Sequence, residues 1–151
     1  MRISAKADYA VRAALELAVA EDPPVKGERI AQAQGIPVKF LENILLDMRH
    51  AGLVASQRGP DGGYRLQRPA GEVTVADVVR AVDGPLAVVH GERPEDIAYE
   101  GVATGLQQVW IALRASVRSV LEEVTLADLA EGSIPAAVRD LAREPDAWER
   151  R

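Results

Sequence analysis

Apolar and polar positions along most of this chain follow the pattern of short amphipathic helices. Val11, Leu15 and Ala18 recur at helical spacing and predict a first helix, which Ser4 caps. Asp22 and the two prolines after it are expected to end that helix. Aromatic residues make up only 4% of the chain, so its core must consist largely of Ala, Val and Leu. The chain is therefore predicted to be mainly helical.

Two further short helices are predicted between residues 27 and 52, with a tight turn between them. The first stops at Gly35, and Pro37 fits the first turn of the second, where a missing N–H does no harm. Gly52 is expected to cap the end of the second helix. The predicted buried face of this helix consists of Phe40 or Leu41, Ile44, Leu45 and Met48. Such a pair is typical of a helix-turn-helix, although any compact helical pair would give the same pattern.

The stretch "LVASQRGPDGGYRL", from Leu53 to Leu66, changes to the alternation expected of a strand pair. Its centre holds a Pro-Asp turn and two glycines, which predict a tight hairpin with Arg58 at its tip. A helix-turn-helix followed by a two-stranded wing is a DNA-binding arrangement. The predicted fold class is therefore mainly α with a small β-wing, a winged helix-turn-helix domain.

The longest periodic run lies in the second half of the chain, from Ile97 to Val124, after a short helix from Thr74 to about Val82. A continuous helix over that run would be roughly 40 Å long at ~1.5 Å per residue, which is more than a small globule beside it needs. We therefore expect a dimerisation helix that crosses its twin, with a central core helix as the alternative. The expected interface residues are Leu106, Val109, Trp110, Leu113, Val117 and Val120.

These elements suggest a division of the chain into four parts. Residues 1–84 are predicted to form the winged helix-turn-helix domain, and residues 85–98 a connecting loop. Residues 99–131 are predicted to hold the dimerisation helix and a short following helix, which Thr125 caps. Residues 132–151 are expected to form a C-terminal helix and an exposed tail.

Charge is distributed unevenly between the two halves of the chain. The whole chain carries a net charge of -5, which by itself argues against a nucleic-acid partner. However, residues 1–68 contain ten Lys and Arg against eight Asp and Glu, a net charge of +2, and the remaining residues carry -7. The excess of positive charge thus falls on the part that carries the predicted DNA-binding elements.

Composition and motifs also exclude several classes of function. The chain has no cysteine, which excludes disulfides, thiolate catalysis and sulfur-ligated metal. The turn "GPDGG" cannot be a P-loop, because no Lys-Ser/Thr follows and a strand comes next. No catalytic Ser/His/Asp set is present, so the chain is not expected to be an enzyme. No apolar stretch suits a signal peptide or a membrane span, and a cytoplasmic location without membrane partners is expected.

Three segments together resemble the Rrf-two family of bacterial winged-helix regulators, of which IscR, NsrR and CymR are members. They are "ISAKADYAVRAALELA", "FLENILLDMRHAGLVASQRGPDGGY" and "VTVADVVRAVDG", and the resemblance runs from Met1 to about Leu129. It implies a homodimeric transcription factor that binds an imperfect palindrome and usually represses. The alternative is a winged-helix module for protein association that has lost specific DNA binding.

The resemblance also assigns residues to DNA. It places Arg58 in the minor groove, where the negative potential of narrow A·T-rich segments attracts arginine, with Gly59 and the later glycines letting the turn approach phosphates. The second helix of the pair becomes the recognition helix, whose side chains toward DNA are Lys39, Phe40, Glu42 and Asn43. The expected phosphate contacts are Ser4, Lys6 and Arg49, with Tyr9 either contacting phosphate or packing the first helix. Phe40 could equally be core, Glu42 a solvated position, and Lys6 and Arg49 plain surface charges.

Members of the family that bind a cluster carry cysteines between "AVDG" and the long helix, and this chain has none there. His90, Glu92, Glu95 and Asp96 remain in that segment, where a solvated acidic loop is the simpler interpretation. Asp8, an acidic residue of the first helix, is expected to pair with a nearby Lys or Arg. We therefore expect no metal and no cofactor. Three alternatives stay open for an effector: a small molecule, a partner protein, or none. Tyr99 and Trp110 could line a pocket for a small molecule, or both could instead pack in the dimer interface.

Overall fold

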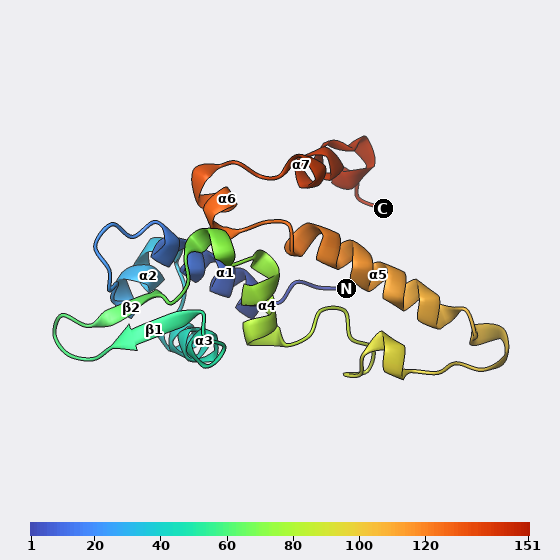
Figure 1. The fold of residues 1–151 in the computed structure, drawn as a ribbon, viewed down its shortest axis with the longest axis horizontal. Helices are drawn as coiled ribbons and strands as arrows, with labels where there is room; N and C mark the ends of the chain where they lie inside the picture. The colour runs from blue at the N-terminus through green and yellow to red at the C-terminus, as the bar shows by residue number, and fades with distance from the viewer.

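The computed structural model describes all residues, 1–151. Figure 1 shows a compact winged part, made from the first half of the chain, and a single long helix that extends away from it. The element order is α1 Ala5–Ala18, α2 Gly27–Gln34, α3 Val38–His50, β1 Val54–Gln57, β2 Gly63–Leu66, α4 Val75–Asp83, α5 Leu106–Leu121, α6 Leu126–Glu131 and α7 Ala136–Arg143. Short 3-10 turns lie at residues 70–72, 94–96, 101–103 and 145–148. The predicted fold class, mainly helical with a small wing, is confirmed.

The helix ends follow the local signals in the sequence. The Ser4 hydroxyl accepts a hydrogen bond from the Ala7 N–H at 2.9 Å and caps α1 as predicted. Gly35 ends α2 in the left-handed conformation, with φ of 63°. Pro37 stands one residue before α3 and caps it, not within its first turn.

The wing is a two-stranded antiparallel hairpin. Val54 pairs with Leu66 at its base and Gln57 with Gly63 near its tip. Val25, in the connection between α1 and α2, extends the hairpin through reciprocal backbone hydrogen bonds with Tyr64 of 2.8 and 2.7 Å. The wing is therefore held on both sides, by the end of α3 and by the segment before α2.

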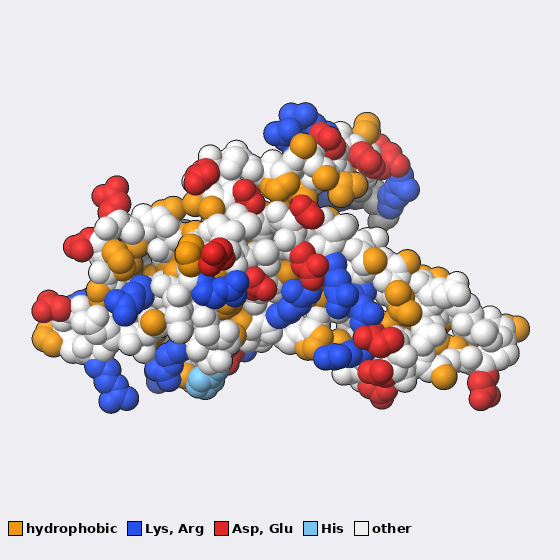
Figure 2. Space-filling model, in the orientation of Figure 1, with side chains coloured by type: hydrophobic (Ala, Val, Ile, Leu, Met, Phe, Trp, Pro, Cys, Tyr) orange, Lys and Arg blue, Asp and Glu red, His pale blue; other side chains and the backbone are white.

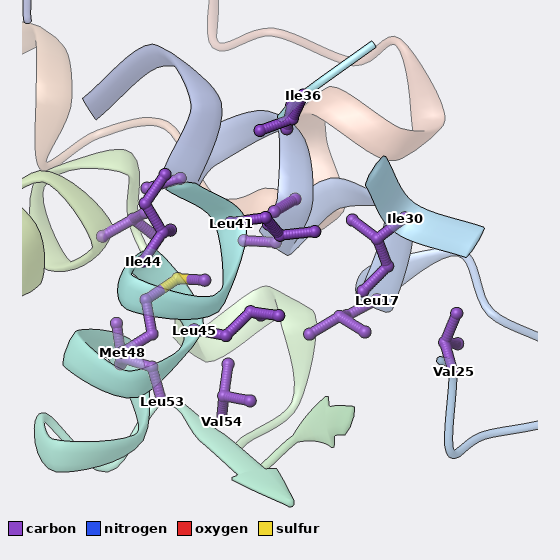
Figure 3. Close-up of a cluster of buried hydrophobic side chains, with 14 of the residues drawn as sticks. Leu17, Val25, Ile30, Ile36, Leu41, Ile44, Leu45, Met48, Leu53 and Val54 are labelled. Atoms are coloured by element: carbon purple, nitrogen blue, oxygen red, sulfur yellow. The ribbon is translucent and has the colours of Figure 1, made fainter. Parts of the chain in front are cut away.

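The core of the winged part is aliphatic and rests on α1. Ala10, Ala13 and Ala14 of α1 are buried, and such small side chains let neighbouring helices approach closely. Figure 3 shows the larger side chains of this cluster, which come from α1, α2, α3 and β1 and from the connections beside them, where Val25, Ile36 and Leu53 lie. No polar or charged residue is buried. Phe40 is half-buried while Leu41 is fully buried, so Leu41 holds the core position that the pattern left open.

A backbone bridge connects the C-terminal part to the winged part. Val75 donates its N–H to the Val124 carbonyl at 2.9 Å, and Leu126 donates to the Val73 carbonyl at 2.9 Å. The side chain of Leu126 is fully buried in the core of the winged part. Thus α6, expected to belong with the dimerisation helix, packs against α1; the four-part division of the chain stays a prediction.

The long helix is shorter than predicted. It begins at Leu106, not near Ile97, because Gly101 adopts φ of 60° and residues 94–96 and 101–103 form two 3-10 turns instead. The Gln107 amide fixes this arrangement by donating to the carbonyls of Pro94 and Ile97 at 3.2 and 2.7 Å. With 16 residues, α5 spans about 24 Å at ~1.5 Å per residue.

Thr74 caps α4 with a reciprocal pair of hydrogen bonds. Its hydroxyl accepts from the Asp77 N–H at 3.1 Å, and its own N–H donates to the Asp77 carboxylate at 3.0 Å. We expect Thr74→Ala to lower the free energy of unfolding by about 1 kcal/mol, because the Asp77 N–H loses its partner. Urea denaturation measures this loss. Thr74→Ser keeps the hydroxyl and should stay close to the parent; an equal loss in both variants would assign the effect to packing of the methyl group.

Candidate nucleic-acid interface

The two faces of α3 have different chemistry. Leu41, Ile44, Leu45 and Met48 are buried against the rest of the domain. On the opposite face, the exposed residues recur three and four positions apart: Lys39, Glu42, Asn43, Leu46 and Arg49. This second face carries an ammonium, a carboxylate, an amide and a guanidinium, all on exposed residues. It can therefore offer hydrogen-bond donors and acceptors to an external partner.

The wing and the end of α3 enclose a groove. A cavity of about 420 Å³ lies between them and the start of α2, and its basic side chains are those of Lys26, Arg49 and Arg58. Arg49 donates to the Ser56 hydroxyl at 3.1 Å, which holds its guanidinium against strand β1 of the wing. Arg58 is exposed at the tip and has no carboxylate within ion-pair distance. Three positive charges therefore face one groove that carries a single carboxylate, that of Glu28.

The start of α2 opens into the same groove. Its cap residue, Lys26, makes no side-chain hydrogen bond to the first turn, so the N–H groups there have no side-chain acceptor. Helix N-termini with open N–H groups favour anions such as phosphate. The sequence interpretation missed this contribution, as it missed Leu46, an apolar side chain that is 41% exposed on the outer face of α3. The three- and four-residue spacing from Asn43 and Glu42 could have identified Leu46.

Two glycines of the hairpin serve the fold itself. A Cβ at Gly63 would lie 2.4 Å from the Val25 carbonyl oxygen, and one at Gly62 would lie 2.2 Å from the Gln57 carbonyl oxygen. Both positions therefore require glycine for the chain's own close approaches. These two glycines thus have a cause within the fold, and their expected approach to phosphates stays a prediction. Gly59, by contrast, has φ of 107° and open space around it.

Several residues expected to contact phosphate also have partners inside the chain. Lys6 pairs with Asp47 of α3 at 2.6 Å, and the Ser4 hydroxyl donates to the Asp83 carboxylate at 2.5 Å while it caps α1. Tyr9 packs its ring edge-to-face against Phe40, with centroids 5.6 Å apart. These contacts join α1 and its cap residue to α3 and α4. The contacts of these residues with DNA remain predictions.

The segment between α4 and α5 does not provide a metal centre. It has no thiolate, and no three His, Asp or Glu side chains lie close enough to hold an ion. Glu95 is instead paired with Arg114, and hydrogen bonds from its own backbone and from Arg114 hold the pKa of its carboxyl below the usual value. Asp8 pairs with Arg12 at 3.1 Å, as predicted. The donor groups present therefore do not fit an iron–sulfur cluster.

The sequence matches the profile of the Rrf2 family, described as "Iron-dependent Transcriptional regulator", over residues 3–132. The chain belongs to the Rrf2 family. It is 53% identical over 150 residues to Rv1287 of Mycobacterium tuberculosis, which is named as an HTH-type transcriptional regulator; the match covers 99% of this chain and 93% of that protein. The family consists of transcriptional regulators, so the prediction that the chain is not an enzyme is confirmed.

Solved structures of family members share the fold. The structure of CymR, the global cysteine regulator of B. subtilis, superposes with a TM-score of 0.69 at 32% identity, covering 87% of this chain and 98% of that one. IscR of T. potens superposes with a TM-score of 0.71 at 28% identity, covering 100% of this chain and 93% of that one. The resemblance expected from the sequence is thus confirmed. None of the helices is long and apolar enough to cross a bilayer.

Proposed function

We propose that this protein is a sequence-specific DNA-binding regulator that binds a palindromic operator as a homodimer and represses transcription. Membership of the Rrf2 family implies DNA binding. The observation that carries the proposal further is a basic groove lined by Arg49, the free Arg58 and the open start of α2. Arg49 also lines a neighbouring hollow together with Glu42, Asn43 and Leu46 of the exposed face of α3. Arg49 and Tyr64 line both hollows, so the groups proposed to read bases adjoin those proposed to bind phosphate.

Within this proposal α3 is the recognition helix. Asn43 is suited to adenine, Glu42 to the amino group of cytosine, and Lys39 to guanine or phosphate. The apolar side chain of Leu46 is suited to a thymine methyl group. Arg49, Lys26 and the N–H groups at the start of α2 would hold the backbone phosphates and set the register. Arg58 would enter the adjacent minor groove.

The proposal of a dimer is supported by the surroundings of α5. None of its 16 residues is buried, and Val109 is 54% exposed, although the helix has an apolar stripe. Figure 1 shows most of α5 extending beyond the winged part, and Figure 2 shows hydrophobic side chains along that extension. An apolar stripe that its own chain leaves half-buried or exposed is typical of a protein interface. A twofold dimer would also match two half-sites.

The direct test is a footprint of the purified protein across its own promoter region, followed by binding to the protected duplex at several salt concentrations. Two protected half-sites about one helical turn apart, with log K falling linearly with log salt, are expected. A repressor further lowers transcription from that promoter in a purified system. Absence of salt-dependent duplex binding would favour the alternative, a winged-helix module used for protein association.

We also expect the protein to purify colourless. With no cysteine and no competent donor set between α4 and α5, it should contain no stoichiometric iron or sulfide. Anaerobic purification followed by absorption spectroscopy and metal and sulfide analysis measures this. A brown protein with a reproducible iron content per chain would contradict this account of the segment.

A further inference from the structure

Four arginines converge where α4, the loop after it and α5 meet. Arg80 comes from α4, Arg93 from the loop, and Arg114 and Arg118 from α5, and all four line one cavity of about 360 Å³. Figure 2 shows a concentration of Lys and Arg side chains over this junction. Cavities of this size fall within the range of small-molecule sites.

The carboxylates around this cavity do not balance the arginines. Glu95 lines the cavity and pairs with Arg114, whose side chain is only 12% exposed. Glu122, one turn further along α5 than Arg118, pairs with Arg80. The two carboxylates thus neutralise two of the four guanidinium groups.

The other two arginines have no carboxylate of their own, because the nearest ones already pair with Arg80 and Arg114. Glu122 lies 3.9 Å from the Arg118 guanidinium, at the limit of an ion pair, and already binds Arg80. Arg93 is exposed and has no carboxylate within ion-pair distance. Like charges held together in one concave site repel one another, and an anion between them removes that repulsion. Guanidinium groups also match the planar forks of carboxylate and phosphate.

We propose that this cavity binds a small molecule with at least two negative charges, of the phosphate-ester or polycarboxylate kind. The site is separate from the wing groove, whose basic side chains come from other elements. It joins the last helix of the winged part to α5. As an effector site it rests on the proposed function, but the binding itself does not.

Binding is tested by isothermal titration calorimetry on the full-length protein, with inorganic pyrophosphate and citrate as probes and NaCl at matched ionic strength as the blank. Saturable binding of at least one probe, at one molecule per chain, is expected. The probe that binds more tightly identifies phosphate or carboxylate chemistry as the preferred one. No saturable binding of either probe above the NaCl blank would overturn the proposal.

Charge variants locate the bound anion. Arg93→Gln and Arg118→Gln should each weaken binding by about ten-fold, the loss expected for one charge-assisted contact. Glu122→Gln should tighten binding, because it removes a competing carboxylate. Arg58→Gln, in the wing groove, should leave binding unchanged, which separates this site from the proposed DNA surface. Loss of binding in Arg58→Gln alone would place the anion in the wing groove and overturn the proposal.

A second copy of the chain could instead supply acidic residues to these arginines. Sedimentation of Arg93→Gln and Arg118→Gln distinguishes the two cases. An unchanged oligomeric state together with weakened anion binding supports the site. Dissociation of an oligomer in both variants, without any effect on anion binding, would show that the arginines serve an interface.

Discussion

Leu113→Glu is expected to convert the proposed dimer into monomers. Leu113 is half-buried at the middle of the apolar stripe on α5, where the helix has few neighbours from its own chain. A carboxylate there would have to be buried without a partner in the crossed pair of helices, which is far more costly than leaving it in water on a monomer. Sedimentation equilibrium or light scattering measures the change in mass.

Loss of the dimer should also weaken operator binding strongly. In a dimer, binding of one DNA-binding domain to its half-site raises the effective concentration of the second domain at the other half-site. A monomer lacks this effect, so its affinity for the operator should be lower, typically by ~100-fold or more. Val109→Glu, at a position that is 54% exposed in the chain, should have the same effect without any cost to the monomer fold. Ala115→Glu, on the opposite side of α5, is the matched control and should remain dimeric. A Leu113→Glu protein that stays folded and dimeric would show that the stripe does not form the dimer interface.

Much of the winged part could be predicted from the sequence because its signals are local. Ser4 and Thr74 are cap residues followed by apolar periodicity, and Gly35 occupies the left-handed position that ends a helix. The switch from helical spacing to alternation after Leu53 marks the wing. Each of these signals is read within about ten residues, so no knowledge of the tertiary fold is needed.

The start of α5 could not be placed from periodicity alone. Gly101 and Gly105 were visible signals, but apolar residues at helical spacing continue across them. The segment before α5 is held in a non-helical path by contacts between residues ten or more apart. In these contacts the Gln107 amide donates hydrogen bonds to the carbonyls of Pro94 and Ile97. Such contacts depend on the tertiary fold.

The candidate site also has a part that could be predicted from local spacing and a part that could not. The outer face of α3 and the tip position of Arg58 follow from spacing, so those residues could be named. The pairing of Lys6 with Asp47 and the close approach of Gly63 to Val25 join segments about 40 residues apart. No pattern in the sequence predicts such contacts. The four arginines of the arginine-lined cavity likewise lie far apart in the sequence, between positions 80 and 118, and share no motif.

Arg58→Ala is expected to weaken operator binding by ~1–3 kcal/mol, about five- to 150-fold, if the arginine reads a narrow minor groove. The side chain is exposed and has no ion pair in the chain, so the melting temperature should be nearly unchanged. The slope of log K against log salt should fall by about one unit, since one phosphate-neutralising charge is lost. Quantitative titration of the footprinted duplex over a salt series measures both quantities.

The discriminating comparison is between operator and random duplex. A narrow A·T-rich minor groove is what makes an inserted arginine favourable, so Arg58→Ala should weaken random DNA less than the operator. Lys6 is an expected phosphate contact, but it pairs with Asp47, so Lys6→Ala would also disturb the contact between α1 and α3. Lys26→Ala, exposed at the start of α2, is the cleaner control and should weaken both duplexes alike. Equal losses for the two duplexes in Arg58→Ala would show that the wing holds phosphate only, and no loss for either would place the wing away from DNA.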